Sequence, residues 1–172
     1  MSTIIIATIL IAITIAFPLV FILVNRKKAR QQNEENLKLF RIAGSNNGLS
    51  FSHYQVLKNK IIGLDTLNKS LLIFELNKAN VILIDMKKAT SCTIYKEYES
   101  IEIGGNKKAM MEKHLRSIDL KFCLKGNAEP VLVSYYNSNI NSIYEMAELE
   151  TKAKEWHMLL SAMLLKELKA TA

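Results

Sequence analysis

The hydrophobic pattern begins with an apolar run at residues 4–24, in which no position carries a charge. In a helix that rises about 1.5 Å per residue, this run spans about 32 Å, which is enough to cross the hydrocarbon core of a bilayer. Basic residues follow the run closely, and none precedes it: Arg26, Lys27, Lys28 and Arg30. Under the positive-inside rule, this asymmetry predicts that residues 1–25 form a single-pass anchor in the cell (inner) membrane. The short N-terminus would lie outside, and the C-terminal domain would be cytoplasmic.

A cleaved signal peptide is the main alternative for this run. Such a peptide carries positive charge ahead of an apolar core of about 7–15 residues, whereas all the side-chain charge here follows the run. The basic residues after the run can also attract anionic headgroups, although a purely topogenic role is favoured for a chain that a helix already holds. Pro18 lacks an amide hydrogen and is expected to bend the helix. The residues that represent the predicted anchor are Ile4, Ile11, Pro18 and Val24.

Residues 26–43 favour a second helical stretch, with Gly44 as its stop signal. Its beginning is charged on every side, and apolar residues return only near its end, at Leu37, Leu39 and Phe40. We therefore expect residues 26–48 to form a helical stalk or linker that leads from the membrane to a domain over residues 49–172.

Between residues 51 and 136 the pattern changes to short apolar runs separated by turn-forming residues. The clearest run is 117–124, where apolar and polar residues alternate as in a strand with one buried face. Turn signals recur every 8–15 residues or so, which predicts antiparallel meanders rather than parallel βαβ units. Residues 107–116 fit either a hairpin loop or a helical turn. The expected strands are 60–65, 70–76, 81–86, 89–98, 100–103, 117–124 and 131–136.

Residues 142–169 show the periodicity of one long amphipathic helix. Apolar residues step by three or four positions along one stripe, and charged residues occupy the other sides. The stripe consists of Met146, Leu149, Ala153, Trp156, Leu160 and Met163. A run of strands followed by one helix predicts an α+β domain.

This pattern of short strands closed by a C-terminal helix with a central Trp resembles a pleckstrin-homology-like domain over about residues 50–168. The resemblance implies an antiparallel, partly open β-barrel that the C-terminal helix closes, with Trp156 as the plug. Lipid-binding members of that family hold phosphoinositide with clustered Lys and Arg in the loop between the first two strands. The matching loop here, residues 66–69, has one basic residue, so that ligand is not implied. The chain is also similar to uncharacterised membrane-anchored proteins of Bacteroidota, in residues 62–65 and in Ile84-Asp85 ahead of a Cys; this similarity supplies no activity.

Composition adds little chemistry. The formal charge of +7 arises largely beside the predicted anchor, so it gives no reason to expect nucleic acid binding. Cys92 and Cys123 are the only cysteines and are expected to be free thiols in the cytoplasm. No metal or cofactor is expected, because the histidines lack ligand spacing and no Gly-rich phosphate loop is present. Two enzymatic arrangements are possible, and neither is favoured: a thiol nucleophile at Cys123 with His114 as its base, and a pair of carboxylates, Asp65 and Asp85, for acid–base work. The three histidines are His53, His114 and His157.

One basic patch stands out in the predicted domain, made of Lys107, Lys108, Lys113 and Arg116. It would suit headgroups of the nearby leaflet or an acidic partner, but a solvated loop is the favoured interpretation. Stacking aromatics are absent from it, which argues against single-stranded nucleic acid.

The sequence thus predicts a membrane-anchored, cytoplasm-facing interaction module that is not an enzyme. Its expected partner is a membrane-associated protein or peptide, bound along a sheet edge or beside the terminal helix, near Tyr135 and Tyr136. A sensor of anionic headgroups, acting through the basic patch, is the alternative, and a Cys-dependent hydrolase is the least favoured function. Partner identity and oligomeric state do not follow from the sequence.

Overall fold

The computed structural model describes residues 2–78, 80–103, 110–126 and 129–170; within them, the side chains of residues 2–16, 18, 19, 101–103, 110–112 and 166–170 are not described. The chain forms two compact units, Met1–Gly48 and Leu49–Ala172. The first unit is one long helix, and the second contains the described strands and a second long helix.

Helix α1 (Ser2–Asn46) is continuous over 45 residues. The predicted stop at Gly44 is wrong, because the helix continues to Asn46 and ends where Gly48 takes a positive φ of 66°. The amides of Asn47 and Gly48 donate to the carbonyls of Gly44 and Ser45, each at 3.0 Å. Such local bonds, closed by a glycine with positive φ, are typical of a helix C-terminus. The predicted anchor and stalk therefore belong to one element.

No helix among the residues with described side chains is both long and apolar enough to cross a membrane. Most of the predicted span, including Ile4, Ile11 and Pro18, lies outside those residues. Val24 and the basic residues that follow it are exposed on α1.

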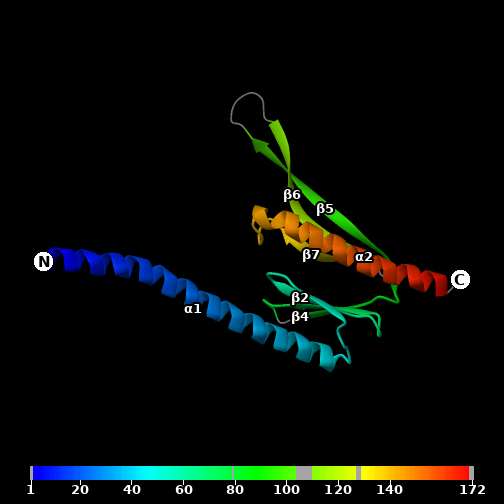
Figure 1. Ribbon diagram of the computed structural model, residues 1–172. Coiled ribbons are helices and arrows are strands. Elements are labelled where there is room, and N and C mark those ends of the chain that lie inside the picture. The colour runs from blue at the N-terminus through cyan, green and yellow to red at the C-terminus, as the bar shows by residue number, and fades with distance from the viewer. Residues whose placement is uncertain (1, 79, 104–109, 127–128, 171–172) are drawn as a thin grey trace. The chain divides into compact units, whose positions relative to one another are not determined.

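The described strands form two antiparallel sheets (Figure 1). One sheet has the order β1-β2-β3-β4 and the other has the order β5-β6-β7. The predicted partly open barrel is wrong, because these sheets stay separate and neither closes on itself. The strands are β1 (His53–Val56), β2 (Lys60–Asp65), β3 (Ser70–Glu75), β4 (Asn80–Asp85), β5 (Ala89–Ile103), β6 (Met110–Leu124) and β7 (Val131–Asn137).

Three of the strands differ from the predicted ones. β1 is an additional strand, and its exposed residues give no apolar pattern that would reveal it. β5 joins two predicted strands into one of 15 residues, and β6 extends the predicted strand 117–124 back to Met110. β7 pairs only with residues 117–122 of β6. The remainder of β5 and β6 projects from the body as a two-stranded ribbon (Figure 1).

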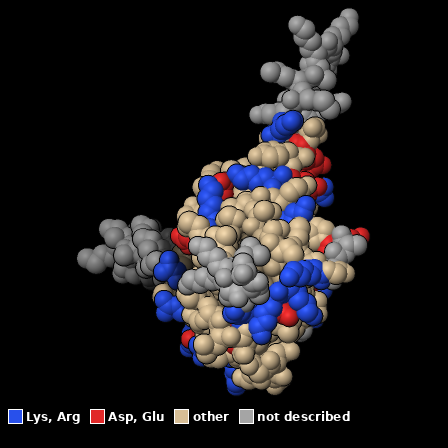
Figure 2. Space-filling view, turned by 90° about the vertical axis from the view of Figure 1, so that its right-hand side faces the viewer, with Lys and Arg blue, Asp and Glu red and all other residues tan. Residues whose placement is uncertain are grey.

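Three turns leave the sheets at one end. Asp65, Ser70 and Asp85 pair in one row across the first sheet, so the β2–β3 and β4–β5 turns lie side by side. The amide of Lys125, in the β6–β7 turn, donates to the carbonyl of Lys88 at 2.8 Å and joins the third turn to them. Figure 2 looks onto this side of the molecule, where Lys and Arg side chains gather.

The C-terminal helix begins with a capping box. Ser142 accepts a hydrogen bond from the amide of Tyr144, and Glu145 accepts one from the amide of Ser142 at 2.7 Å. These bonds satisfy amides at the start of the short helix η1 (Ile143–Glu145), which leads into α2 (Met146–Ala170). Helix α2 packs along the three-stranded sheet and faces the four-stranded one (Figure 1).

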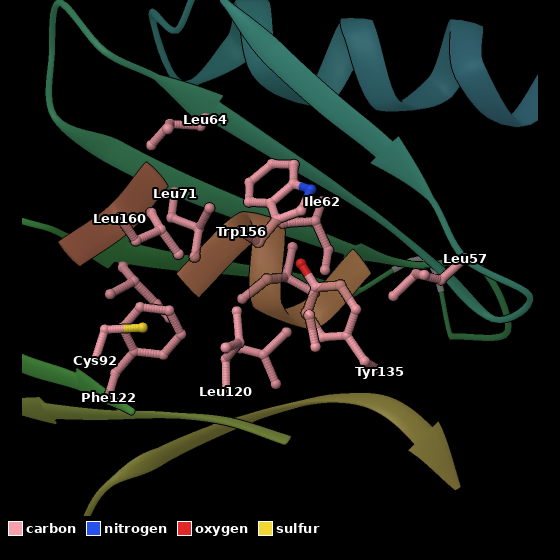
Figure 3. Close-up of a cluster of buried hydrophobic side chains, with 14 of the residues drawn as sticks. Leu57, Ile62, Leu64, Leu71, Cys92, Leu120, Phe122, Tyr135, Trp156 and Leu160 are labelled. Atoms are coloured by element: carbon pink, nitrogen blue, oxygen red, sulfur yellow. The ribbon is translucent and has the colours of Figure 1, made fainter. Parts of the chain in front are cut away.

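The core lies where the two sheets and α2 meet (Figure 3). Leu149, Ala153, Trp156 and Leu160 are buried, and Met146 and Met163 pack against them partly buried. Because this stripe fills the space between the sheets, it holds their edge strands apart, which explains why no barrel closes. The first sheet adds Leu57, Ile62, Leu64 and Leu71, and the second adds Cys92, Leu120, Phe122 and Tyr135.

Replacing Trp156 tests this account of the core. Trp156 is 7% exposed, and Trp156→Ala should lower the free energy of unfolding by about 3–5 kcal/mol, because it removes buried area and leaves a cavity. Met158 lies on the same helix and is 63% exposed, so the control Met158→Ala should change that free energy by less than about 0.5 kcal/mol. Urea unfolding of the full-length protein, followed by circular dichroism, measures both. Equal effects of the two changes would contradict the account.

Candidate binding groove

A groove of about 410 Å³ lies between the edge of the four-stranded sheet and α2. The sheet side contributes Ser52 and the first residues of β1, and the helix side contributes three residues of α2 that lie within little more than one turn. Because the two sides are far apart in the sequence, only the docking of α2 brings them together. The lining residues are Ser52, His53, Tyr54, Glu155, Trp156 and Leu159.

The floor of the groove is apolar and its rim is polar. Trp156 and the partly buried Leu159 belong to the core or pack against it, so only their outer parts reach the groove. Tyr54 is 52% exposed on the sheet side. Glu155 is exposed on the helix side and has no ion pair with any other described residue. The groove therefore combines apolar surface with one free carboxylate.

The sheet side of the groove is held in place by Ser52. Its amide and its hydroxyl both donate to the carbonyl of Leu64, at 2.9 and 3.0 Å. The hydroxyl oxygen lies 3.2 Å from Nδ1 of His53. Because the hydroxyl of Ser52 donates to Leu64, this contact is consistent with Nδ1 of His53 donating to the hydroxyl oxygen.

β1 is the outermost strand of its sheet, with β2 as its only pairing partner among the described strands. The amide of Leu57 donates to the carbonyl of Lys60 at 2.8 Å. This bond shows which residues of β1 direct their backbone groups to β2. In an antiparallel pair, alternate residues direct their backbone groups to the partner strand. This alternation turns the amide and carbonyl of Val56 away from β2, toward the open edge.

Polar contacts fasten α2 to β5 behind the groove. His157 Nε2 lies 3.1 Å from the carbonyl of Cys92 and 3.3 Å from Oγ of Ser161. A carbonyl only accepts, so Nε2 carries the hydrogen and cannot serve as a base toward Ser161. Glu150 accepts from Lys154 at 2.7 Å and from Lys96 of β5 at 3.0 Å, and these bonds lower its pKa.

The structure places the two cysteines in different surroundings and sets Cys123 far from His114. Cys92 and Cys123 are both free thiols, and they occupy opposite faces of the β5–β6 pair. Burial raises the pKa of Cys92 to about 12, so this thiol stays protonated at neutral pH. Cys123 and His114 lie nine residues apart on the single strand β6, a separation of about 30 Å. The least favoured arrangement, in which His114 acts as the base for Cys123, is therefore not formed.

The basic patch of the sequence does not form one described surface. Lys107 and Lys108 lie outside the described residues. Lys113 is exposed on the ribbon, opposite Ser100. Arg116 lies at a β-bulge, with its Nη1 3.4 Å from Oε1 of Glu97. A surface of converging cations is thus not seen among the described members of this patch.

The tyrosines that the sequence places near a partner site are core residues. Tyr135 and Tyr136 are each 2% exposed, so neither can contact a partner without unfolding. Among the described residues, neither the hydroxyl of Tyr135 nor the buried Oε1 of Gln55 on β1 has a hydrogen-bond partner. Burial raises the pKa of Tyr135.

The carboxylates at the strand ends accept hydrogen bonds from backbone amides of the neighbouring turns. Asp65 accepts hydrogen bonds from the amides of Ser50, Leu67 and Asn68 at 2.7–2.9 Å, and from Nδ2 of Asn68 at 2.8 Å. Burial alone would raise the pKa of Asp65, but these bonds lower it below its ordinary value. Asp85 accepts from the amide of Lys87 at 3.0 Å. Ser70 pairs between the two aspartates, which sets them about 10 Å apart.

The loop between the first two strands also differs from the predicted one. Because β1 precedes β2, this loop is the turn at Lys58 and Asn59, and residues 66–69 form the β2–β3 turn instead. Lys58 is the only basic residue of the loop, and its Nζ donates to the carbonyl of Ile140 at 2.8 Å. Clustered cations for a phosphoinositide are thus missing from this loop as well.

No three His, Cys, Asp or Glu side chains among the described residues lie close enough to hold a metal ion. Comparison of the chain with protein-family models, with curated proteins and with solved structures finds no match. The function must therefore be argued from the groove and from the chemistry of its lining.

Proposed function

We propose that the chain is a non-enzymatic interaction module that binds an extended segment of a protein partner in the groove between β1 and α2. Residues 4–24 hold the module at the cytoplasmic face of the cell membrane, and the partner is a membrane-associated protein. An anchor of this kind raises the concentration of the module near such partners. Four plus three antiparallel strands followed by a long helix support the resemblance to pleckstrin-homology-like domains.

The observation that carries the proposal is a groove that joins a sheet edge to a helix. Extended peptides add to exposed sheet edges through main-chain hydrogen bonds, and pockets beside the edge select their side chains. The outward amide and carbonyl of Val56 supply the main-chain groups, and the lining of α2 supplies the pocket. Val56 lies two residues beyond Tyr54 on β1, so the outward main-chain groups continue the strand that lines the groove.

The lining also indicates the kind of segment that fits. The apolar surface at Trp156 and Leu159 favours an apolar side chain of the partner, because their contact removes the groove surface and that side chain from water. The free carboxylate of Glu155 favours a Lys or Arg next to it. We therefore expect a segment in which an apolar residue neighbours a basic one.

The other two functions have less support. A hydrolase would need a nucleophile beside a base, and neither Cys123 with His114 nor Ser161 with His157 provides that arrangement. A headgroup sensor built on the β5–β6 ribbon would need converging cations, but Arg116 is paired with Glu97.

Selection from a random peptide library on the purified full-length protein tests the groove. The selected peptides should place an apolar residue beside Lys or Arg. Glu155→Lys should weaken their binding at least tenfold, about 1.4 kcal/mol, since it replaces attraction by repulsion. Met158→Lys introduces the same charge on an exposed position of the same helix that does not line the groove, and it should leave the affinity unchanged. Peptides that bind both variants equally would contradict the proposal.

Labelling of intact cells tests the anchor separately. A cysteine placed after Ala172 should resist an impermeant maleimide until the cells are opened, because the positive-inside rule puts that end in the cytoplasm. A cysteine at Ser2 should react from outside in intact cells. Reaction of the C-terminal cysteine in intact cells, or a mature chain that begins after Val24, would contradict the proposed anchor.

A further inference from the structure

The three turns at one end of the sheets form a second surface, and none of their residues lines the groove. We call it the basic end and define it as Leu67, Lys87, Lys88 and Lys125. Backbone hydrogen bonds fix these turns to one another. The amide of Met86 donates to the carbonyl of Lys69 at 2.9 Å, and the amide of Lys125 donates to the carbonyl of Lys88 at 2.8 Å. The four side chains therefore stand on one rigid part of the fold.

The lysines of the basic end form no ion pair with any described residue. Lys87, Lys88 and Lys125 are all exposed. Asp85, in the same turn as Lys87, uses its Oδ1 to accept the amide of Lys87. Three cations held close together by turns from both sheets attract an anionic surface.

Leu67 distinguishes among anionic surfaces. Its side chain is 87% exposed at the tip of the β2–β3 turn. Asp65 holds the turn in this shape by accepting the amides of Leu67 and Asn68, each at 2.9 Å. An exposed aliphatic side chain is not removed from water by contact with a nucleic acid or a soluble polyanion, so it adds no binding free energy there. It does add binding free energy on a bilayer, because it can leave water and enter the boundary between headgroups and acyl chains.

We propose that the basic end rests on a bilayer that contains anionic lipids, with the three lysines at the headgroups and Leu67 in the interface. This contact uses residues from the β2–β3, β4–β5 and β6–β7 turns, none of which lines the groove. It does not require the peptide groove to be occupied. An anchor at residues 4–24 would keep this surface within reach of one leaflet, but the contact itself does not depend on the anchor.

Lysine acetylation of the full-length protein in nanodiscs tests the proposal. One set of discs contains phosphatidylcholine only, and the other also contains phosphatidylserine. Acetylation of Lys87, Lys88 and Lys125, followed by mass spectrometry, should be several-fold slower in the anionic discs. Lys78 is exposed in the β3–β4 turn, at the other end of the sheet, and serves as the matched control with equal rates in both. Equal rates at the three lysines in both kinds of disc would overturn the proposal.

Two further measurements separate a bilayer from a dissolved anion. Leu67→Ser keeps every charge and should remove much of the protection; full protection in this variant would overturn the proposal. Soluble glycerophosphoserine added to neutral discs should not protect the lysines, and protection by it would likewise overturn the proposal. Retention of the chain by neutral discs measures insertion of the anchor alone. Failure of the anchor would therefore appear as loss of retention, and failure of the basic end as unprotected lysines in the anionic discs.

Discussion

The packing of α2 against both sheets is the interaction on which the domain depends. Trp156 and Leu160 are buried between a four-stranded and a three-stranded sheet that do not pair with each other. An apolar sheet face left in water is unfavourable, and the helix supplies the surface that covers the inner face of each sheet. The contacts of Glu150 with Lys96 and of His157 with the Cys92 carbonyl fix its position along β5. The same docking creates the groove, because Trp156 and Leu159 are among its lining residues.

Periodicity in the sequence predicts the elements that bury one face and fails for those that do not. The apolar stripe of α2 and the alternation over residues 117–124 both mark residues that the core contains. β1 carries no such signal, since its position is fixed by pairing with β2 rather than by burial. Barrel closure also lies beyond sequence patterns, because it depends on whether edge strands meet. Gly44 shows the same limit at shorter range: the helix continues through it, and Gly48 ends it.

Candidate sites, too, can be predicted from the sequence only where they do not depend on how distant segments are brought together. The basic patch at residues 107–116 is contiguous in sequence, yet Arg116 is paired with Glu97. His114, the least favoured candidate base for Cys123, lies far from it along the same strand. The lysines of the basic end are spread over two turns, and the two sides of the groove come from opposite ends of the domain sequence. Each set is assembled by strand register and helix docking, which a single sequence does not specify. The groove and the basic end therefore emerge only from the structure.

Native-state hydrogen exchange tests the central role of α2 most directly. If the helix joins both sheets into one cooperative unit, the slowest amides of β2, β6 and the stretch from Ala153 to Leu160 should exchange with a single opening free energy. They should also respond to denaturant with a single slope. Exchange of β2 and β6 with distinct opening free energies, or exchange of α2 ahead of both, would show that the sheets are stable without the helix and would contradict the account.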